Sequence, residues 1–165
     1  MASRRRGGKM SAADAAEQAK IREARQTQMQ FAVPNSFRCL RIVGKGAYGM
    51  VCEAIDKKAA KGKERVAIKK IKEALFHPLD AKLVLRELKI SRLIGKHPNI
   101  LGIRDLIRPN SKRRMDTIYI VSDFMDTDLY RLCQSQVEFT ENHVRHLMYQ
   151  MLCGLNYMHS ANILH

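Results

Sequence analysis

A glycine-rich stretch offers the first chemistry in this sequence. Residues 44–51 carry glycines at positions 44, 46 and 49. Glycine has no Cβ, so a loop with this spacing lets the backbone approach phosphate oxygens closely. Dinucleotide-binding folds use a similar loop, but there a helix follows the third glycine and an acidic residue comes about 20 positions later. Here residues 50–55 have the pattern of a strand, and Lys69 and Lys70 occupy the later region. We therefore reject a dinucleotide-binding fold.

A lysine in the next strand-like segment is the second candidate. Side chains alternate across a strand, so Ala67 and Lys69 share one face while Val66, Ile68 and Lys70 take the other. The small Ala67 leaves room for a flat base, and Lys69 can reach phosphates from the same face. The alternative is that both lysines lie on the surface. The glycine-rich stretch upstream favours the phosphate-binding interpretation.

A lysine in this role needs a carboxylate to hold it, and Glu87 is the candidate. It lies in the middle of an amphipathic segment, between apolar positions. The alternative is a solvated glutamate that pairs with a lysine or arginine on its own helix, which contributes little to stability. In the functional interpretation, an ion pair with Lys69 orients the lysine and reports whether the helix is docked.

The elements that must position these residues can be read from periodicity and breakers. Strands are expected at 37–43, 50–55, 65–71, 100–107 and 117–121. Helices are expected at 79–94, 129–134 and 141–159, the last with Thr140 as its N-cap and an apolar stripe at helical spacing. This order predicts an α+β fold with a five-stranded antiparallel sheet and one main helix, followed by further helices.

The N-terminal residues 1–36 have a different composition. Arg4, Arg5 and Arg6 make the start basic, and Ser11 can cap an alanine-rich helix that runs to about Gln30. Because its apolar positions are mostly alanine, this helix can bury little. We expect a mobile or frayed extension rather than a helix that binds a partner.

Composition limits the classes of function. The chain has 165 residues and a formal charge of +14, which indicates a solvated surface with some affinity for phosphates, nucleic acid or anionic membranes. No basic run is interleaved with aromatic residues, so no nucleic acid is expected as a partner. No apolar run is long enough to span a membrane and no secretory signal is evident. We expect a cytoplasmic protein that could also enter the nucleus.

The metal-ligating residue types lack metal-site spacing. The cysteines at 39, 52, 133 and 153 form no C-x-x-C motif or disulfide framework, so we expect reduced thiols. His143 and His146 have no accompanying ligand pair and are interpreted as ordinary helix residues. No metal site is expected within these residues.

The sequence from Phe37 to His165 resembles a eukaryotic Ser/Thr protein kinase, and specifically a mitogen-activated protein kinase. Eight segments carry the resemblance in the right order. They are 44–52, 66–71, 85–90, 97–100, 118–121, 125–130, 149–155 and 159–165. The resemblance implies a kinase N-lobe and hinge at 37–125 and the start of a C-lobe at 126–165.

The resemblance also implies ATP as the ligand and assigns roles around it. Residues of the glycine-rich stretch would cover the phosphates, Lys69 would hold the α- and β-phosphates, and Glu87 would orient Lys69. The adenine would contact the backbone of the hinge. The other implied ATP-binding residues are Val43, Gly44, Lys45, Gly46, Ala47, Tyr48, Gly49, Met50, Val51, Ala67, Ser122, Asp123, Phe124, Met125 and Asp128. Of these, Val51 and Ala67 would touch adenine, Asp123, Phe124 and Met125 would form the hinge, and Asp128 would approach the ribose.

Two positions depart from the family pattern. Ser122 lies at the back of the implied ATP pocket, where a larger side chain is common. We expect the space beside this small residue to accommodate bulky adenine-competitive inhibitors. Ser91 lies one turn after Glu87, where an apolar residue usually packs on the neighbouring strand. A polar group there is expected to weaken docking of the helix.

The family's remaining catalytic residues are not among these 165. His165 would open the H-R-D-x-x-x-x-N motif, whose Asp accepts the substrate proton and whose Asn, with the Asp of D-F-G, holds Mg²⁺. We therefore expect a truncated, inactive piece of a kinase that exposes the apolar stripe of its last helix. The complete kinase would bind Mg²⁺, protein substrates, docking peptides and an upstream activating kinase. The alternatives are a non-catalytic protein that binds nucleotide or docking peptides, and a basic interaction protein acting through residues 1–31.

Overall fold

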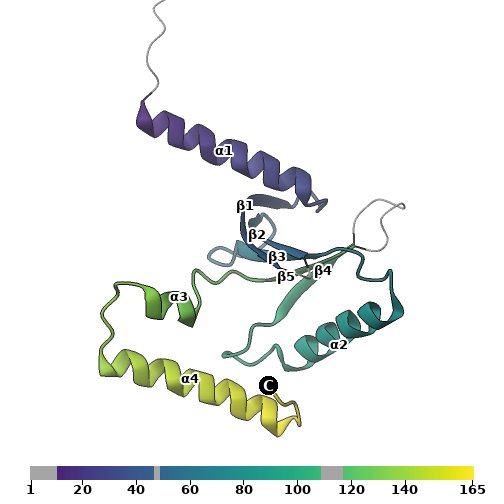
Figure 1. Cartoon of the computed structure of the whole chain (residues 1–165), viewed down its shortest axis with the longest axis vertical. Coiled ribbons are helices and arrows are strands. Elements are labelled where there is room, and N and C mark those ends of the chain that lie inside the picture. Colours follow the sequence, from purple (N-terminus) through teal and green to yellow (C-terminus); the bar gives the residue numbers. More distant parts are fainter. Residues whose placement is uncertain (1–10, 47–48, 109–116) are drawn as a thin grey trace, which may run out of the picture.

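The computed structural model describes residues 11–46, 49–108 and 117–165, and an antiparallel sheet lies at its centre (Figure 1). The strand order is β1-β2-β3-β5-β4. The strands are β1 (Phe37–Gly46), β2 (Gly49–Asp56), β3 (Arg65–Ile71), β4 (Ile103–Ile107) and β5 (Ile118–Asp123). The helices are α1 (Ala12–Gln30), α2 (Pro78–Ile94), α3 (Leu129–Gln134) and α4 (Glu141–Ser160). The predicted α+β class with a five-stranded antiparallel sheet is confirmed.

Three strand boundaries differ from the expectation by more than one residue. β1 extends to Gly46, so the glycine-rich residues continue the ladder until Gly46 pairs with Gly49. β4 begins only at Ile103 because the backbone of Gly102 passes against Gly95 at the end of α2, where a Cβ on Gly102 would lie 2.4 Å from the Gly95 carbonyl oxygen. β5 continues to Asp123, so the first expected hinge residue is the last residue of a strand.

The larger hydrophobic core lies on one face of the sheet. Side chains that alternate along β2 and β3 point into it, and the members from these two strands are fully buried. The buried cluster comprises Phe31, Phe37, Cys39, Cys52, Ala54, Val66, Ile68, Ile107, Tyr119 and Val121. This arrangement agrees with the predicted placement of Val66 and Ile68 on the face opposite Lys69.

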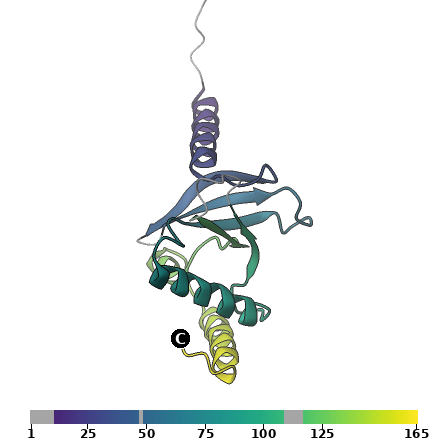
Figure 2. The ribbon, with the colours of Figure 1, turned by 90° about the vertical axis from the view of Figure 1, so that its right-hand side faces the viewer.

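The N-terminal helix contributes to this core only at its C-terminal end, where Thr27 is its one buried residue. Ser11 caps α1 as predicted and its side chain accepts a hydrogen bond from Asp14 N, and most of the helix is exposed. At its far end, however, Thr27 and Phe31 are buried, and Gln28 Oε1 accepts a hydrogen bond of 2.8 Å from Cys39 N of β1. The C-terminal end of α1 therefore packs against the sheet, and the rest of the helix points away from it (Figure 2).

A smaller core lies on the other face of the sheet, under α2. Ile71, Ala74 and Ile120 are buried there, and Val84 and Leu88 of α2 pack against them. Pro78 at the first position of α2 and His77 as its N-cap fix where this helix begins. The two views show α1 and α2 on opposite sides of the sheet (Figures 1 and 2).

The C-terminal helix α4 contacts the loop that follows α2. The rings of His97 and Tyr157 stack with their centroids 4.6 Å apart. Gly154 lies so close to Asn99 that a Cβ would come within 3.0 Å of its carbonyl oxygen. Much of the apolar stripe of α4 is exposed, including Val144 and Met148. Among the described residues, no helix has the length and apolar character needed to cross a membrane.

Candidate functional site

The ion pair between Lys69 and Glu87 is the centre of the candidate site. Lys69 Nζ of β3 lies 2.6 Å from Glu87 Oε1 of α2, as expected from the sequence. The side chains are 37% and 45% exposed, so the pair is open to solvent and to a ligand. Because Lys69 alternates with the buried Ile68, its side chain must leave the sheet on the side of α2. The pair therefore links the sheet and the helix across a cleft.

The hairpin between β1 and β2 lies beside Lys69. Val51 of β2 is the cross-strand partner of Lys69, which brings the end of the glycine-rich stretch next to the lysine. Gly49 has a φ of 139°, and a Cβ there would lie 1.9 Å from the carbonyl oxygen of Lys70. This close approach of two backbones requires glycine. The chain thus uses Gly49 to fold the hairpin tightly onto β3.

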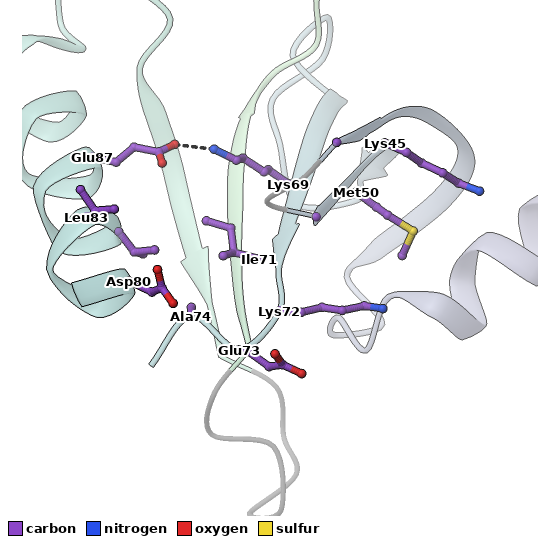
Figure 3. A pocket seen from close by; sticks show the side chains of 13 residues that line it. Lys45, Met50, Lys69, Ile71, Lys72, Glu73, Ala74, Asp80, Leu83 and Glu87 are labelled. Atoms are coloured by element: carbon purple, nitrogen blue, oxygen red, sulfur yellow. Dashed lines mark hydrogen bonds and ion pairs between the residues drawn. The ribbon is translucent and has the colours of Figure 1, made fainter. Parts of the chain in front are cut away.

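A cavity of about 840 Å³ opens between this hairpin, β3 and α2 (Figure 3). It is lined by three lysines and three carboxylates, together with small and apolar residues. The lining residues are Lys45, Gly46, Gly49, Met50, Lys69, Ile71, Lys72, Glu73, Ala74, Asp80, Leu83, Val84 and Glu87. Its volume falls within the range of small-molecule sites. Lysines beside a glycine hairpin are groups that can bind phosphate oxygens.

The structure brings part of the expected ATP-binding set to this cavity. The expected residues that line it are Lys45, Gly46, Gly49, Met50, Lys69 and Glu87. Val43 and Gly44 instead line a second hollow, of about 470 Å³, between β1 and α1. Ala47 and Tyr48 lie outside the described residues. The sequence did not single out the stretch 72–74, which closes the cavity at the end of β3.

None of the residues expected around adenine lines the cavity. Ala67 and Ser122 are cross-strand partners on β3 and β5, and Ser122 is half-buried. Asp123, Phe124 and Met125 follow directly, at the end of β5 and the start of the connection to α3. Ala67, Ser122 and the first residue of the expected hinge therefore lie at the same end of the sheet.

Asp128 has a structural role in addition to the expected approach to the ribose. It is the N-cap of α3, and its Oδ1 accepts a hydrogen bond of 2.8 Å from Arg131 N. Its other oxygen lies 3.5 Å from Arg131 Nε. An aspartate at an N-cap satisfies a backbone N–H that would otherwise lack a partner. The carboxylate is therefore held at the start of α3, close to the hinge in sequence.

Metal-ligating groups do not gather in the part of the chain that the structure describes. No cluster of three or more His, Cys, Asp or Glu side chains there could hold a metal ion. Cys39 and Cys52 are buried free thiols, and Cys133 is exposed.

The fold and the cleft define a protein kinase domain, and the family comparison agrees. The protein kinase domain family matches residues 37–165, so the chain belongs to the protein kinase family. Within that family its similarity is to mitogen-activated protein kinases. It is 48% identical over 126 residues to the mitogen-activated protein kinase homolog MMK2 of Medicago sativa, covering 76% of this chain and 33% of that protein.

Two further relatives give the same result. Extracellular signal-regulated kinase 1 of Dictyostelium discoideum is 43% identical over 136 residues, which is 82% of this chain and 25% of that kinase. Mitogen-activated protein kinase 6 of Oryza sativa subsp. japonica is 45% identical over 126 residues, covering 76% and 32%. The resemblance to mitogen-activated protein kinases is confirmed. The chain spans a third or less of the length of these curated relatives.

Proposed function

We propose that these residues form the ATP-binding part of a mitogen-activated-type Ser/Thr protein kinase, which transfers the γ-phosphate of ATP to protein serine or threonine. The observation that carries the proposal is the Lys69–Glu87 ion pair of 2.6 Å at the wall of the cavity. Kinases of this type need such a pair in place for activity. Family membership supports the reaction class.

In this proposal, positive charge and backbone groups bind the triphosphate. Lys69 donates hydrogen bonds to the α- and β-phosphates, and Glu87 keeps its ammonium group turned toward the cavity. The hairpin covers the phosphates with its backbone, because Gly46 and Gly49 carry no side chain that would keep a phosphate away. Lys45 adds a second positive charge at the same wall.

The base and the ribose are proposed to lie along the edge that leads to α3. Val51 and Ala67 contact the faces of adenine, and backbone groups of residues 123–125 bond its edge. Asp128 approaches the ribose. Ser122 leaves space behind the base, because it presents a small side chain opposite Ala67.

Catalysis needs further groups, and we propose that these 165 residues alone bind nucleotide without transferring phosphate. The complete kinase is proposed to use Mg²⁺, whose family ligands belong to motifs that these residues do not contain. Protein substrates, docking peptides and an upstream activating kinase are proposed partners of the complete enzyme.

Calorimetric titration with ATP in the presence of Mg²⁺ tests the binding proposal. We expect saturable 1:1 binding to the wild-type chain and a loss of at least about tenfold in affinity for Lys69→Met, since a charged hydrogen bond to phosphate is removed. Lys89→Met is the matched control, because Lys89 is an exposed lysine of α2 outside the cavity. Equal affinities for wild type and Lys69→Met would refute the assignment of Lys69.

A further inference from the structure

Glu53 is a buried carboxylate on the cleft side of β2. Its neighbours Cys52 and Ala54 point into the large core, so Glu53 points to the opposite face, the face of Val51. Its cross-strand partner on β3 is Ala67, one of the residues proposed to touch adenine. Glu53 is only 6% exposed, and a buried charge needs partners that compensate for lost hydration.

Two arginines provide this compensation. Arg41 Nε donates to Glu53 Oε2 at 2.8 Å. Arg65 donates to Oε1 through Nε at 3.1 Å and through Nη2 at 2.9 Å. Both oxygens of the carboxylate are therefore occupied by charged donors, which are stronger than neutral ones. This geometry fixes the plane of the Arg65 guanidinium.

The rest of the Arg65 guanidinium holds the segment between β5 and α3. Its Nη1 lies 2.8 Å from Asp126 Oδ1, and its Cζ lies 4.5 Å from the centroid of the Phe124 ring. The hydrogen bonds with Glu53 first, and then those with Asp126, raise the pKa of Arg65 above its usual value. Arg65 therefore joins the buried carboxylate of the sheet to the connecting segment.

The two ends of this chain of contacts differ in strength. Asp126 has a side chain that is 76% exposed, and an exposed ion pair alone contributes little. Glu53 is buried and held on both oxygens, so it is the rigid end. Without its negative charge, Arg65 would be free to turn toward solvent and would release both Asp126 and the face of Phe124.

We propose that Glu53 is a positioning residue for the nucleotide site: through Arg65 it fixes the hinge segment at Phe124 and Asp126. This inference rests on the proposed function, in which the backbone of residues 123–125 bonds adenine. A segment held in its binding conformation loses less conformational freedom when the ligand binds. Glu53 therefore acts on affinity without touching the nucleotide.

Amide 15N relaxation and ADP titration of the full chain test this proposal together. Glu53→Gln keeps the shape of the side chain and removes its charge. In the absence of nucleotide, we expect the order parameters of residues 124–128 to fall in this variant from about 0.85, the value of a rigid backbone, to below about 0.6, because the charged hydrogen bonds that hold the segment are lost. ADP affinity is expected to fall by several-fold. Glu64→Gln, in the turn before β3, is the matched control and should change neither quantity.

Further variants separate a local effect from a general loss of structure. Arg65→Lys keeps the charge but not the forked geometry, and it should reproduce the lower order parameters if Glu53→Gln fails to fold. In an Asp126→Asn background, Glu53→Gln should lower the order parameters of this segment by less than it does in wild type, since both act through Arg65.

Wild-type order parameters in residues 124–128 and unchanged ADP affinity for Glu53→Gln and Arg65→Lys would overturn the proposal. Failure of the wild-type chain to bind ADP would instead refute the proposed function, and with it the nucleotide role of Glu53. The relaxation measurement would still distinguish the two results, because it is made without nucleotide.

Discussion

Lys69 and Lys70 are neighbours in β3, yet their ammonium groups lie on opposite faces of the sheet. Lys69 Nζ is 2.6 Å from Glu87 Oε1 in the cleft. Lys70 is buried, donates to the carbonyl oxygen of Gln30 and lies 5.8 Å from the ring centroids of Phe31 and Tyr119. One lysine thus faces the candidate ligand site, and its neighbour anchors the end of α1.

Replacing the two lysines should separate binding from stability. Lys70→Met is expected to lower the free energy of unfolding by roughly 2 kcal/mol, because the part-buried carbonyl group of Gln30 loses a charged donor. Lys69→Met is expected to change it by less than about 1 kcal/mol, since its ion pair is exposed. Urea denaturation followed by circular dichroism measures both. A larger loss of stability for Lys69→Met than for Lys70→Met would contradict the assignment of the two faces.

Gly49 should tolerate no side chain. Gly49→Ala is expected to cost roughly 3 kcal/mol, because a Cβ would lie 1.9 Å from the Lys70 carbonyl oxygen at a φ of 139°. Its cross-strand partner provides the control, since a Cβ on Gly46 would meet no atom within 4 Å. Thermal unfolding of Gly49→Ala and Gly46→Ala compares the two positions. Similar melting temperatures for these variants would show that the hairpin is not packed on β3 in this way.

Ser122 should control access of bulky ligands to the back of the adenine site. Its cross-strand partners are Ala67 and Ile103, so a larger side chain would fill space between the strands and the cleft. Ser122→Met is expected to weaken bulky adenine-competitive inhibitors by at least about tenfold, because overpacking costs 1–3 kcal/mol. ADP affinity should change little. Equal inhibitor affinity for wild type and variant, measured by calorimetry, would refute this role.

Cys52 should make stability depend on alkaline pH. Its hydrogen bond with Cys39 and its burial raise the pKa of the Cys52 thiol. The folded state therefore keeps a proton that the unfolded state releases above about pH 8.5. The contribution of the protonated Cys52 thiol to the free energy of unfolding is therefore fully present below that pH, and it is lost as the pH rises further. Because Cys39 would remain as a buried thiol in Cys52→Ala, the double variant Cys39→Ala/Cys52→Ala is compared with the exposed control Cys133→Ala in denaturation at increasing pH. Only the double variant should flatten the alkaline decline, and parallel declines would contradict this.

Local sequence patterns were sufficient to predict the sheet and its two faces. Alternation along β3 placed Val66 and Ile68 in the core and Lys69 in the cleft, because strand geometry fixes the direction of each side chain. The partner Glu87 could be expected from its place on an amphipathic helix. These features depend on short-range periodicity, which a single sequence contains.

Two other features that depend on long-range contacts were not predicted. The alanine-rich α1 gives no periodic sign of burial, because it is held by its last turn and by Phe31 rather than by an apolar stripe. The contacts that begin at Glu53 join residues of β1, β2, β3 and the hinge, namely Arg41, Glu53, Arg65, Phe124 and Asp126. The residues of the three strands become neighbours only through the register of the sheet. A polar residue within the strand pattern, such as Glu53, is the signal that could have indicated it.

Titration of the full chain with ADP, followed through the amide chemical shifts of the protein, is the most direct test of the proposed nucleotide site. The account predicts the largest changes at Gly46, Gly49, Val51, Lys69 and the hinge residues 123–125, with saturation at one equivalent and loss of the changes in Lys69→Met. Shifts confined to the hollow between α1 and β1, or none at saturating ADP, would contradict it.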